Sequence, residues 1–218
     1  MSRTNAALAS LATLGVFWCL FLAPIQSSVW NAGASEGPPI AVTLLQPIVA
    51  FGDSIYRAVG SGFGTSYEFW GRLFFPAYLG ALAGVLAIGR PAGRSQAIDR
   101  GRRLASAGLA VAFVADLAAY WSHGTPLEGI FWSAGFGVEL VGLLLAAVGI
   151  GVVAAGLWSA AKGTDAIVLA IGLALILPSV VVIRYLPHGA LLPLAATLAV
   201  VAWRVRIAST AAVPDLQD

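Results

Sequence analysis

Charged side chains are scarce in this chain. Asp, Glu, Lys and Arg make up 10% of its 218 residues, 59% of the residues are hydrophobic, and the mean hydropathy is +0.89. A water-soluble domain of this length needs about a quarter of its residues charged to cover its surface, so the composition argues against a soluble fold. We therefore expect an all-α integral membrane protein in which residues 1–218 form a single transmembrane domain.

Cysteine and histidine are also rare. The single cysteine, Cys19, cannot form an intrachain disulfide, a CxxC redox pair or a cysteine zinc cluster. The two histidines, His123 and His188, lie beside Gly or Pro in segments predicted to be short outer loops, so we interpret them as solvated loop residues and predict no metal site, haem or other cofactor. The formal net charge of +2 comes from arginines in loops and at helix ends, which does not favour nucleic acid as a partner.

Six apolar segments approach or exceed the roughly 20 residues that cross a bilayer. They cover residues 6–30, 69–88, 104–121, 131–158, 166–183 and 190–207. The sixth is the weakest, because its apolar part is short, it contains Pro193, and Arg204 and Arg206 must reach toward the headgroups. The first segment has an alternative as a signal peptide cleaved near Ala34. Its apolar run exceeds the about 7 to 15 residues typical of such peptides, which favours a retained span.

The basic residues predict how these spans are oriented. Of the twelve, only Arg57, Arg72 and Arg184 fall in one set of alternate loops, and the other nine fall in the opposite set. Lys and Arg accumulate in cytoplasmic loops, so both termini and the basic loop 89–103 are predicted to be cytoplasmic in a multi-pass protein of the cell membrane. The nine residues of the larger set are Arg3, Arg90, Arg94, Arg100, Arg102, Arg103, Lys162, Arg204 and Arg206.

The longest loop, residues 31–68, would then lie on the outer side. Residues 40–51 are apolar but too few to cross, and Pro47 interrupts them, so we expect an interfacial or re-entrant segment that packs over the bundle and can cap a pocket. The glycine-rich residues 60–64 follow no predicted strand. They are therefore interpreted as a flexible hinge and not as a nucleotide-binding loop.

Residues 47–55 of this loop, with the sequence PIVAFGDSI, resemble the nucleophile block of the GDSL-type hydrolases, in which an apolar strand leads into Gly-Asp-Ser. The resemblance implies an esterase with Ser54 as its nucleophile. That family also needs an Asp-x-x-His pair near the C-terminus, a Gly-x-Asn-Asp element and a soluble α/β sheet, and none of these is present in the sequence. A serine without a base to accept its proton is a poor nucleophile, so we do not assign this activity.

Two acidic residues lie inside apolar segments, Asp116 in the third and Glu139 in the fourth. With Trp121 and Phe131 as interface markers, a rise of about 1.5 Å per residue places Asp116 about 8 Å and Glu139 about 12 Å below the outer boundary. Consecutive helices are antiparallel, so the two acids can meet. Small residues on the same helix face as Glu139 indicate that it points into the bundle. We predict that Asp116 and Glu139 form an acid–base pair with a catalytic role.

Further polar residues are predicted to bind a ligand at the same outer rim. Tyr120 follows Asp116 by one helical turn, and His123 continues that stripe if the helix persists. Glu68 and Arg72 are spaced as an i, i+4 pair at the start of the second span, and Arg184 lies at the end of the fifth. The expected ligand-binding residues are therefore Glu68, Arg72, Tyr120, His123 and Arg184.

The two acids have two competing interpretations. Each is either a structural tie between helices, protonated or paired with an arginine such as Arg72 or Arg184, or part of a site with a function. Three classes of function follow: a pocket that binds or acts on a small or lipidic ligand, an accessory subunit that contacts a larger membrane protein, or a small-solute transporter. Transport fits least well, because the inner halves of the spans contain no buried charge. Whether the protein is an enzyme is left open.

Overall fold

The computed structural model describes residues 2–88 and 95–211, and these residues form helices, turns and loops without a β-strand. Six helical segments are long and apolar enough to cross a membrane: Arg3–Trp30, Ser66–Ile88, Gln96–Trp121, Glu128–Ser159, Gly163–Ile183 and Leu186–Ala208. Each overlaps one predicted span, so the all-α class and six apolar segments are confirmed. The helices are α1 (Ser2–Trp30), α2 (Ile40–Leu44), α3 (Gln46–Ile55), α4 (Ser66–Arg72), α5 (Phe75–Ile88), α6 (Gln96–Trp121), α7 (Glu128–Ser159), α8 (Gly163–Ala174), α9 (Ile176–Ile183) and α10 (Leu186–Ala211).

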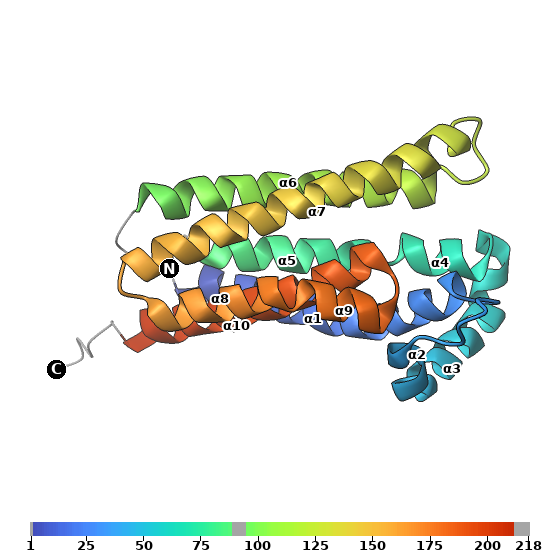
Figure 1. Ribbon diagram of the computed structural model, residues 1–218, viewed down its shortest axis with the longest axis horizontal. Helices are drawn as coiled ribbons and strands as arrows, with labels where there is room; N and C mark the ends of the chain where they lie inside the picture. Colours follow the sequence, from blue (N-terminus) through green and yellow to red (C-terminus); the bar gives the residue numbers. More distant parts are fainter. Residues whose placement is uncertain (1, 89–94, 212–218) are drawn as a thin grey trace.

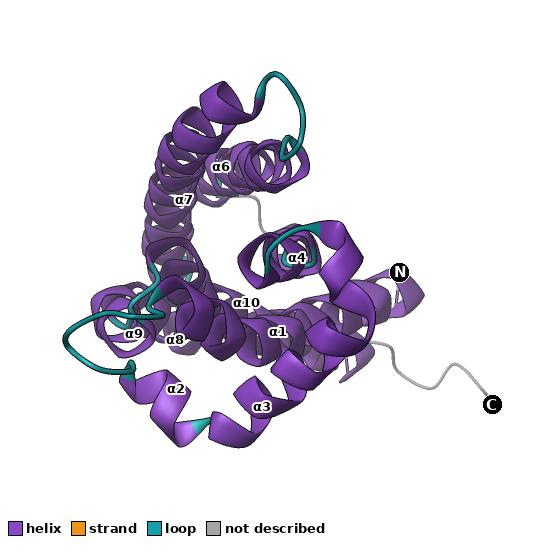
Figure 2. Ribbon diagram, turned by 90° about the vertical axis from the view of Figure 1, so that its right-hand side faces the viewer, coloured by secondary structure: helices purple, strands orange, loops and turns teal. Residues whose placement is uncertain are grey.

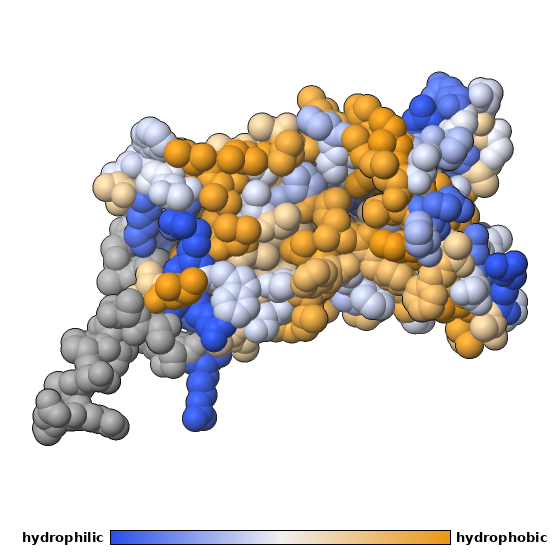
Figure 3. Space-filling view, turned by 90° about the horizontal axis from the view of Figure 1, so that it is seen from below, coloured by the Kyte–Doolittle hydropathy of each residue, from blue (hydrophilic) through white to orange (hydrophobic). Residues whose placement is uncertain are grey.

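The bundle has two distinct ends (Figure 1). At the terminal end, α1 begins and α10 finishes; at the loop end lie α2, α3, the start of α4 and the connection from α6 to α7. Apolar surface covers the middle of the face shown in Figure 3, and hydrophilic residues gather toward both ends. The arginines of the first turns of α6 and the last turns of α10 lie at the terminal end, together with Lys162, whereas Arg90 and Arg94 lie outside the described residues. Which end faces the cytoplasm stays a prediction.

Small residues set how closely the helices approach. Helices α6 and α7 run side by side (Figure 1), and a Cβ atom added to Gly108 or Gly142 would meet backbone atoms of the opposite helix. Gly15 of α1 and Gly80 of α5 face each other in the same way. Such close backbone contact is typical of helix packing in membranes, where apolar burial alone gives little attraction between helices.

Two of the six segments are interrupted, and proline accounts for both breaks. Pro76 and Pro178 each lie four residues after the end of the preceding helix, α4 at Arg72 and α8 at Ala174. A proline ring clashes with the carbonyl four residues earlier and has no N–H to donate, so a helix breaks or kinks there. The sequence marks the fifth span, with Pro178 and Ser179, as the only candidate for a broken helix. The structure corrects this, because the second span is interrupted in the same way at Pro76.

The 31–68 segment contains the short α-helices α2 and α3, which are separated at Leu45, close to Pro47. A π-helix (Tyr56–Gly60) and a 3-10 helix (Ser61–Phe63) follow before α4 begins at Ser66. Helix α2 packs against α1 and α9, and α3 packs against α1, so both lie at one margin of the bundle (Figure 2). Ser54 is exposed on α3, where its hydroxyl donates to the Phe51 carbonyl oxygen at 2.7 Å. This helical setting differs from the strand that precedes the nucleophile of a GDSL-type hydrolase.

Candidate functional site

Three ionisable side chains from three helices meet inside the loop-end half of the bundle. Asp116 of α6, Glu139 of α7 and His188 of α10 each offer a ligand atom, and these atoms all lie within 4.8 Å of one another. Their relative exposures are 1%, 0% and 0%. We refer to these three residues as the acid–histidine cluster. The two carboxyl groups therefore lie together, at the similar depth that counting residues from the helix ends predicted.

Helix packing explains why Glu139 faces inward. Gly135, one turn before it, lies against Ala115 and Ala119 of α6, and Gly142 lies against Ala112. Residues three and four positions apart share a helix face, so Glu139 belongs to the face of α7 that α6 covers.

His188 contradicts its interpretation as a solvated loop residue. Helix α10 starts at Leu186, and Pro187 stands in its first turn, where the fixed φ of proline suits a helix and its absent N–H has no partner to lose. The helix thus starts before His188 and turns the ring inward. The imidazole stacks on Phe74, with ring centroids 3.3 Å apart, and meets the edge of Tyr185 at 4.5 Å.

Several polar atoms of the cluster have no hydrogen-bond partner among the described residues. The Tyr78 hydroxyl donates to Oε1 of Glu139. Oε2 of Glu139, Oδ1 of Asp116 and both ring nitrogens of His188 are buried without a partner. An unsatisfied buried polar group costs about 1 to 3 kcal/mol, and native proteins contain few of them. Four such atoms gather at this one place, which makes the cluster the candidate functional site.

Tyrosines separate the cluster from the loop end. The hydroxyls of Tyr67, Tyr120 and Tyr185 are hydrogen-bonded to one another. The Tyr67 and Tyr185 oxygens lie 2.7 Å apart, and the Tyr120 hydroxyl donates to the Tyr67 hydroxyl at 3.1 Å. The Tyr120 and Tyr185 hydroxyls also form a hydrogen bond. Tyr120 and Tyr185 are buried, whereas Tyr67 is partly exposed. Tyr120 stands one turn nearer the loop end than Asp116. We call these three residues the tyrosine layer.

Two local features hold the tyrosine layer in place. Gly71 lies against the Tyr120 ring, which a Cβ atom at that position would overlap. Tyr185 lies in the short connection between α9 and α10, where burial raises the pKa of its phenol. That phenol therefore stays protonated at neutral pH and can donate a hydrogen bond.

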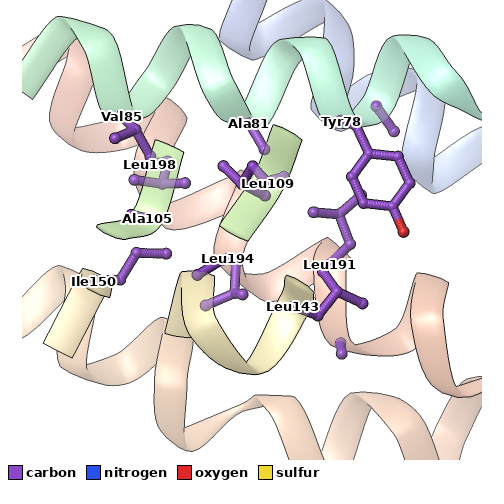
Figure 4. Packing of buried hydrophobic residues seen from close by; sticks show 14 of the residues in the cluster. Tyr78, Ala81, Val85, Ala105, Leu109, Leu143, Ile150, Leu191, Leu194 and Leu198 are labelled. Atoms are coloured by element: carbon purple, nitrogen blue, oxygen red, sulfur yellow. The ribbon is translucent and has the colours of Figure 1, made fainter. Parts of the chain in front are cut away.

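Apolar residues close the opposite side of the cluster. Each member of the cluster has a leucine on the same helix, further from the loop end. Leu143 lies one turn from Glu139 on α7, and Leu191 lies one turn from His188 on α10. Leu109 lies two turns from Asp116 on α6. All three leucines are buried and belong to the same packed core (Figure 4). We call these three residues the leucine floor. The acid–histidine cluster is therefore bounded by tyrosines on one side and by aliphatic side chains on the other.

A second group of ionisable residues lies nearer the surface of the loop end. Nδ1 of His123 is 2.8 Å from Oε1 of Glu68 and 2.7 Å from Oε1 of Glu128. The other oxygen of Glu68 accepts the Thr65 N–H at 2.7 Å and completes the N-terminal cap of α4. Helix α6 ends at Trp121, so His123 leaves the stripe of Asp116 and Tyr120 and turns to this rim group. The predicted Glu68–Arg72 pair is replaced by Glu68–His123.

The two arginines that were expected to approach the acids have other contacts. Arg72 donates to the carbonyl oxygens of Tyr120 at 3.0 Å and Phe63 at 2.9 Å, and its guanidinium lies 5.7 Å from the Trp121 ring centroid. Arg184 forms an ion pair with Glu36 at 3.3 Å and donates to the Gly37 carbonyl oxygen at 3.1 Å. The interpretation of Asp116 and Glu139 as ties to Arg72 or Arg184 therefore has no support in the structure.

Two apolar grooves lie on the surface of the described helices. One, of about 480 Å³, lies between α6 and α7 and includes Val114, Phe131 and Val138 in its lining. The other, of about 630 Å³, lies between α1 and α5. Asp116 and Glu139 line neither of these two grooves, and both side chains are buried.

The structure thus groups the predicted residues differently from the sequence. Tyr120 stays with Asp116 and Glu139, whereas Glu68 and His123 belong to the rim and Arg184 lies elsewhere. His188 was interpreted as a solvated loop residue although Pro187 can start a helix, and Tyr78, Tyr67 and Tyr185 were not predicted. Comparisons of the chain with protein-family models, with curated proteins and with solved structures found no match.

Proposed function

We propose that this chain is a multi-pass membrane protein that binds a small ligand at the acid–histidine cluster, within the outer half of its bundle. One observation carries the proposal: Asp116, Glu139 and His188 come from three helices and are buried, and each offers a ligand atom within 4.8 Å of the other two. Each also has at least one buried polar atom without a hydrogen-bond partner among the described residues. Three ionisable residues at membrane depth are costly unless a partner, water or a proton compensates them. A bound ligand supplies that compensation.

The ligand would reach the cluster from the loop end. The tyrosine layer there contains only side chains that can rotate, and Tyr67 is already partly exposed. On the other side, the leucine floor offers no polar group to a passing solute. The basic residues predict that the loop end faces outward. This arrangement supports exchange with the outer face alone, which suits a binding protein or an enzyme better than a transporter.

Asp116 and Glu139 are proposed to act as a unit. Two carboxylates within 4.8 Å in a region of low dielectric repel each other, so without a bound cation at least one carries a proton. The Tyr78 hydrogen bond to Glu139 fixes one of the two in orientation. This arrangement suits acid–base exchange with a ligand, which is the role predicted for the pair.

Transport, the class that fits the sequence least well, stays a further candidate because two of the six segments are interrupted. Interrupted helices are typical of secondary transporters, where the freed backbone groups bind the substrate. The break between α4 and α5 includes Phe74, which stacks on His188. The leucine floor nevertheless favours access from one side only.

Native mass spectrometry of the detergent-purified protein tests the proposal. We expect the wild type to carry a non-covalent adduct that Asp116→Asn and Glu139→Gln each lose. Asp165→Asn is the matched control, because Asp165 is an acid that pairs with Arg204 at the terminal end. If Asp116 and Glu139 act together, the loss of ligand affinity in the double variant should be clearly smaller than the sum of the losses in the two single variants.

Two results would count against this function. An adduct retained by all the cluster variants would place the ligand elsewhere. A wild type without any adduct, together with cluster variants that only melt at lower temperature, would make the acids structural ties. A stoichiometric protein partner that stays bound to all variants would instead favour the accessory-subunit role.

A further inference from the structure

We propose that the acid–histidine cluster is a binding site for a divalent transition-metal ion, with Zn²⁺ as the best fit, coordinated by Asp116, Glu139 and His188. This inference rests on the proposed function, whose ligand it identifies. Three observations carry it: the kinds of donor atom, their spacing, and the free imidazole of His188.

The donor atoms are those that zinc prefers. Two carboxylate oxygens and one imidazole nitrogen suit Zn²⁺, whereas Ca²⁺ takes six to eight oxygen ligands and Mg²⁺ keeps several waters. The site contains no thiolate, since Cys19 approaches only the backbone oxygen of His188, at 4.0 Å. Soft metal ions such as Cu(I) are therefore disfavoured.

The spacing is close to that of a coordination sphere. Ligand atoms about 2.1 Å from a tetrahedral zinc ion lie about 3.4 Å from one another. The three donor atoms lie within 4.8 Å, so the widest gap has to close by at most about 1.4 Å, the difference between these two values. Rotation about the side-chain bonds of Asp116 and Glu139 can supply a movement of this size.

His188 provides the independent evidence for a metal. Its ring is fully buried, neither nitrogen has a hydrogen-bond partner among the described residues, and one of them faces the two carboxylates. A buried histidine of purely structural role would form a hydrogen bond. Here the ring is held by apolar contact with Phe74 and Tyr185, which fixes its plane and leaves its nitrogens available.

Charge balance also favours a divalent ion. Two carboxylates and a neutral imidazole carry a charge of −2, and one M²⁺ ion brings the total to zero, which suits a site at membrane depth. On binding, the metal displaces any protons held by the carboxyl groups into solution, so the protein releases up to two protons per metal ion.

Tyr78 would act as a positioning residue. Its hydroxyl donates to Oε1 of Glu139, and Oε2 stays free to bind the metal. Hydrogen bonds of this kind orient a ligand, and their loss lowers metal affinity by about 10- to 100-fold. With three protein ligands, at least one coordination position stays open for water or a substrate, as in catalytic zinc sites.

The test starts from full-length protein purified in detergent and stripped with a chelator. We expect it to take up one Zn²⁺ per chain by elemental analysis, to release protons, and to melt at a higher temperature with zinc. His188→Gln and Glu139→Gln should abolish uptake, and Tyr78→Phe should weaken it about 10- to 100-fold. Mn²⁺ is titrated in parallel.

His123→Gln is the matched control, because His123 also lies beside two carboxylates, in the rim group. It should leave zinc uptake unchanged. If His123→Gln abolishes uptake and His188→Gln does not, the metal belongs to the rim and the inference is wrong. Should His188→Gln fail to fold, two other measurements replace it. Weaker zinc binding by Tyr78→Phe, and a visible spectrum of bound Co²⁺ that indicates nitrogen and oxygen ligands, would both support the acid–histidine cluster as the metal site.

The remaining outcomes separate the two proposals. An organic adduct that depends on Asp116 and Glu139, with no uptake of either metal, would leave the ligand site standing and overturn the metal. No adduct and no uptake would overturn both.

Discussion

The two halves of the bundle differ in what fills the space between the same helices. In the terminal-end half, α6 and α7 interlock through Gly101, Ala105 and Gly149, and the neighbouring core is aliphatic. In the loop-end half, the same pair of helices encloses Asp116 and Glu139. Helix α10 likewise passes from His188 at the loop end to Leu191, Leu194 and Leu198 (Figure 4). The tightly packed half acts as a scaffold that holds ionisable groups together in the other half.

This contrast explains how the chain tolerates buried polar groups. Each of the four unpartnered atoms lowers the free energy of unfolding by about 1 to 3 kcal/mol. Their sum is comparable with the whole net stability of a typical domain, about 5 to 15 kcal/mol. Close packing along α6 and α7 compensates part of that cost through many small contacts. Loss of packing in the terminal-end half should therefore destabilise the protein more than any change at the loop-end margin.

The largest expected effect concerns the sidedness of the two ends, and it is all or none. In a Cys19→Ala background, Ala34→Cys at the loop end should react with an impermeant thiol reagent in intact cells, and Ser159→Cys at the terminal end should not, because the basic residues predict that only the loop end is outside. Both should react after permeabilisation. Labelling of Ser159→Cys alone in intact cells would reverse the orientation and the direction of access.

The next effect tests the leucine floor. Leu143→Ala should lower the free energy of unfolding by about 2 to 5 kcal/mol, because it leaves a cavity below Glu139. Leu144→Ala is the control, since Leu144 is 59% exposed toward the lipid-facing surface. Thermal or denaturant unfolding in detergent measures both. Equal losses for the two variants would show that the floor is not tightly packed.

A smaller effect is expected where α6 and α7 approach closely. In Gly142→Ala the new Cβ would lie 2.6 Å from the Ala112 backbone nitrogen, and overpacking of this kind costs about 1 to 3 kcal/mol. Gly137→Ala on the same helix has open space and should be neutral or stabilising by up to about 1 kcal/mol. Melting temperatures of the two variants provide the comparison. If Gly142→Ala is as stable as Gly137→Ala, the contact between α6 and α7 beside Glu139 is looser than the structure indicates.

The smallest effect lies at the margin of the loop end. Ser54→Ala should change stability by less than about 0.5 kcal/mol, because Ser54 is exposed and bonds only within its own helix. It should also leave ester hydrolysis by the purified protein at background, the same as the wild type. Loss of a measurable esterase activity in this variant would restore the hydrolase interpretation of residues 47–55.

The sequence predicted those features that follow from composition and from position along one helix. Apolar length identified six spans, and counting residues from Trp121 and Phe131 placed Asp116 and Glu139 at a common depth. The cluster's third member was not predicted, since the interpretation of His188 depended on where α10 begins. Pro187 was interpreted as a loop residue, whereas proline is also common in the first turn of a helix.

The tyrosine layer depends on tertiary structure and has no local signal. Tyr67, Tyr120 and Tyr185 come from α4, α6 and the connection between α9 and α10. Their meeting requires the break at Pro76, which separates α4 from α5, and the missing side chain of Gly71, which makes room for Tyr120. Neither Pro76 nor Gly71 predicts, from the sequence alone, a hydrogen bond between distant segments.

The connectivity of the acid–histidine cluster also fixes the order of its assembly during synthesis. Asp116 and Glu139 lie on consecutive helices joined by a short turn, so they can meet as soon as the α6–α7 hairpin closes. His188 emerges from the ribosome 49 positions after Glu139, with the last span. A nascent chain therefore holds two facing acids before the imidazole arrives, and the site becomes complete only when α10 enters the bundle.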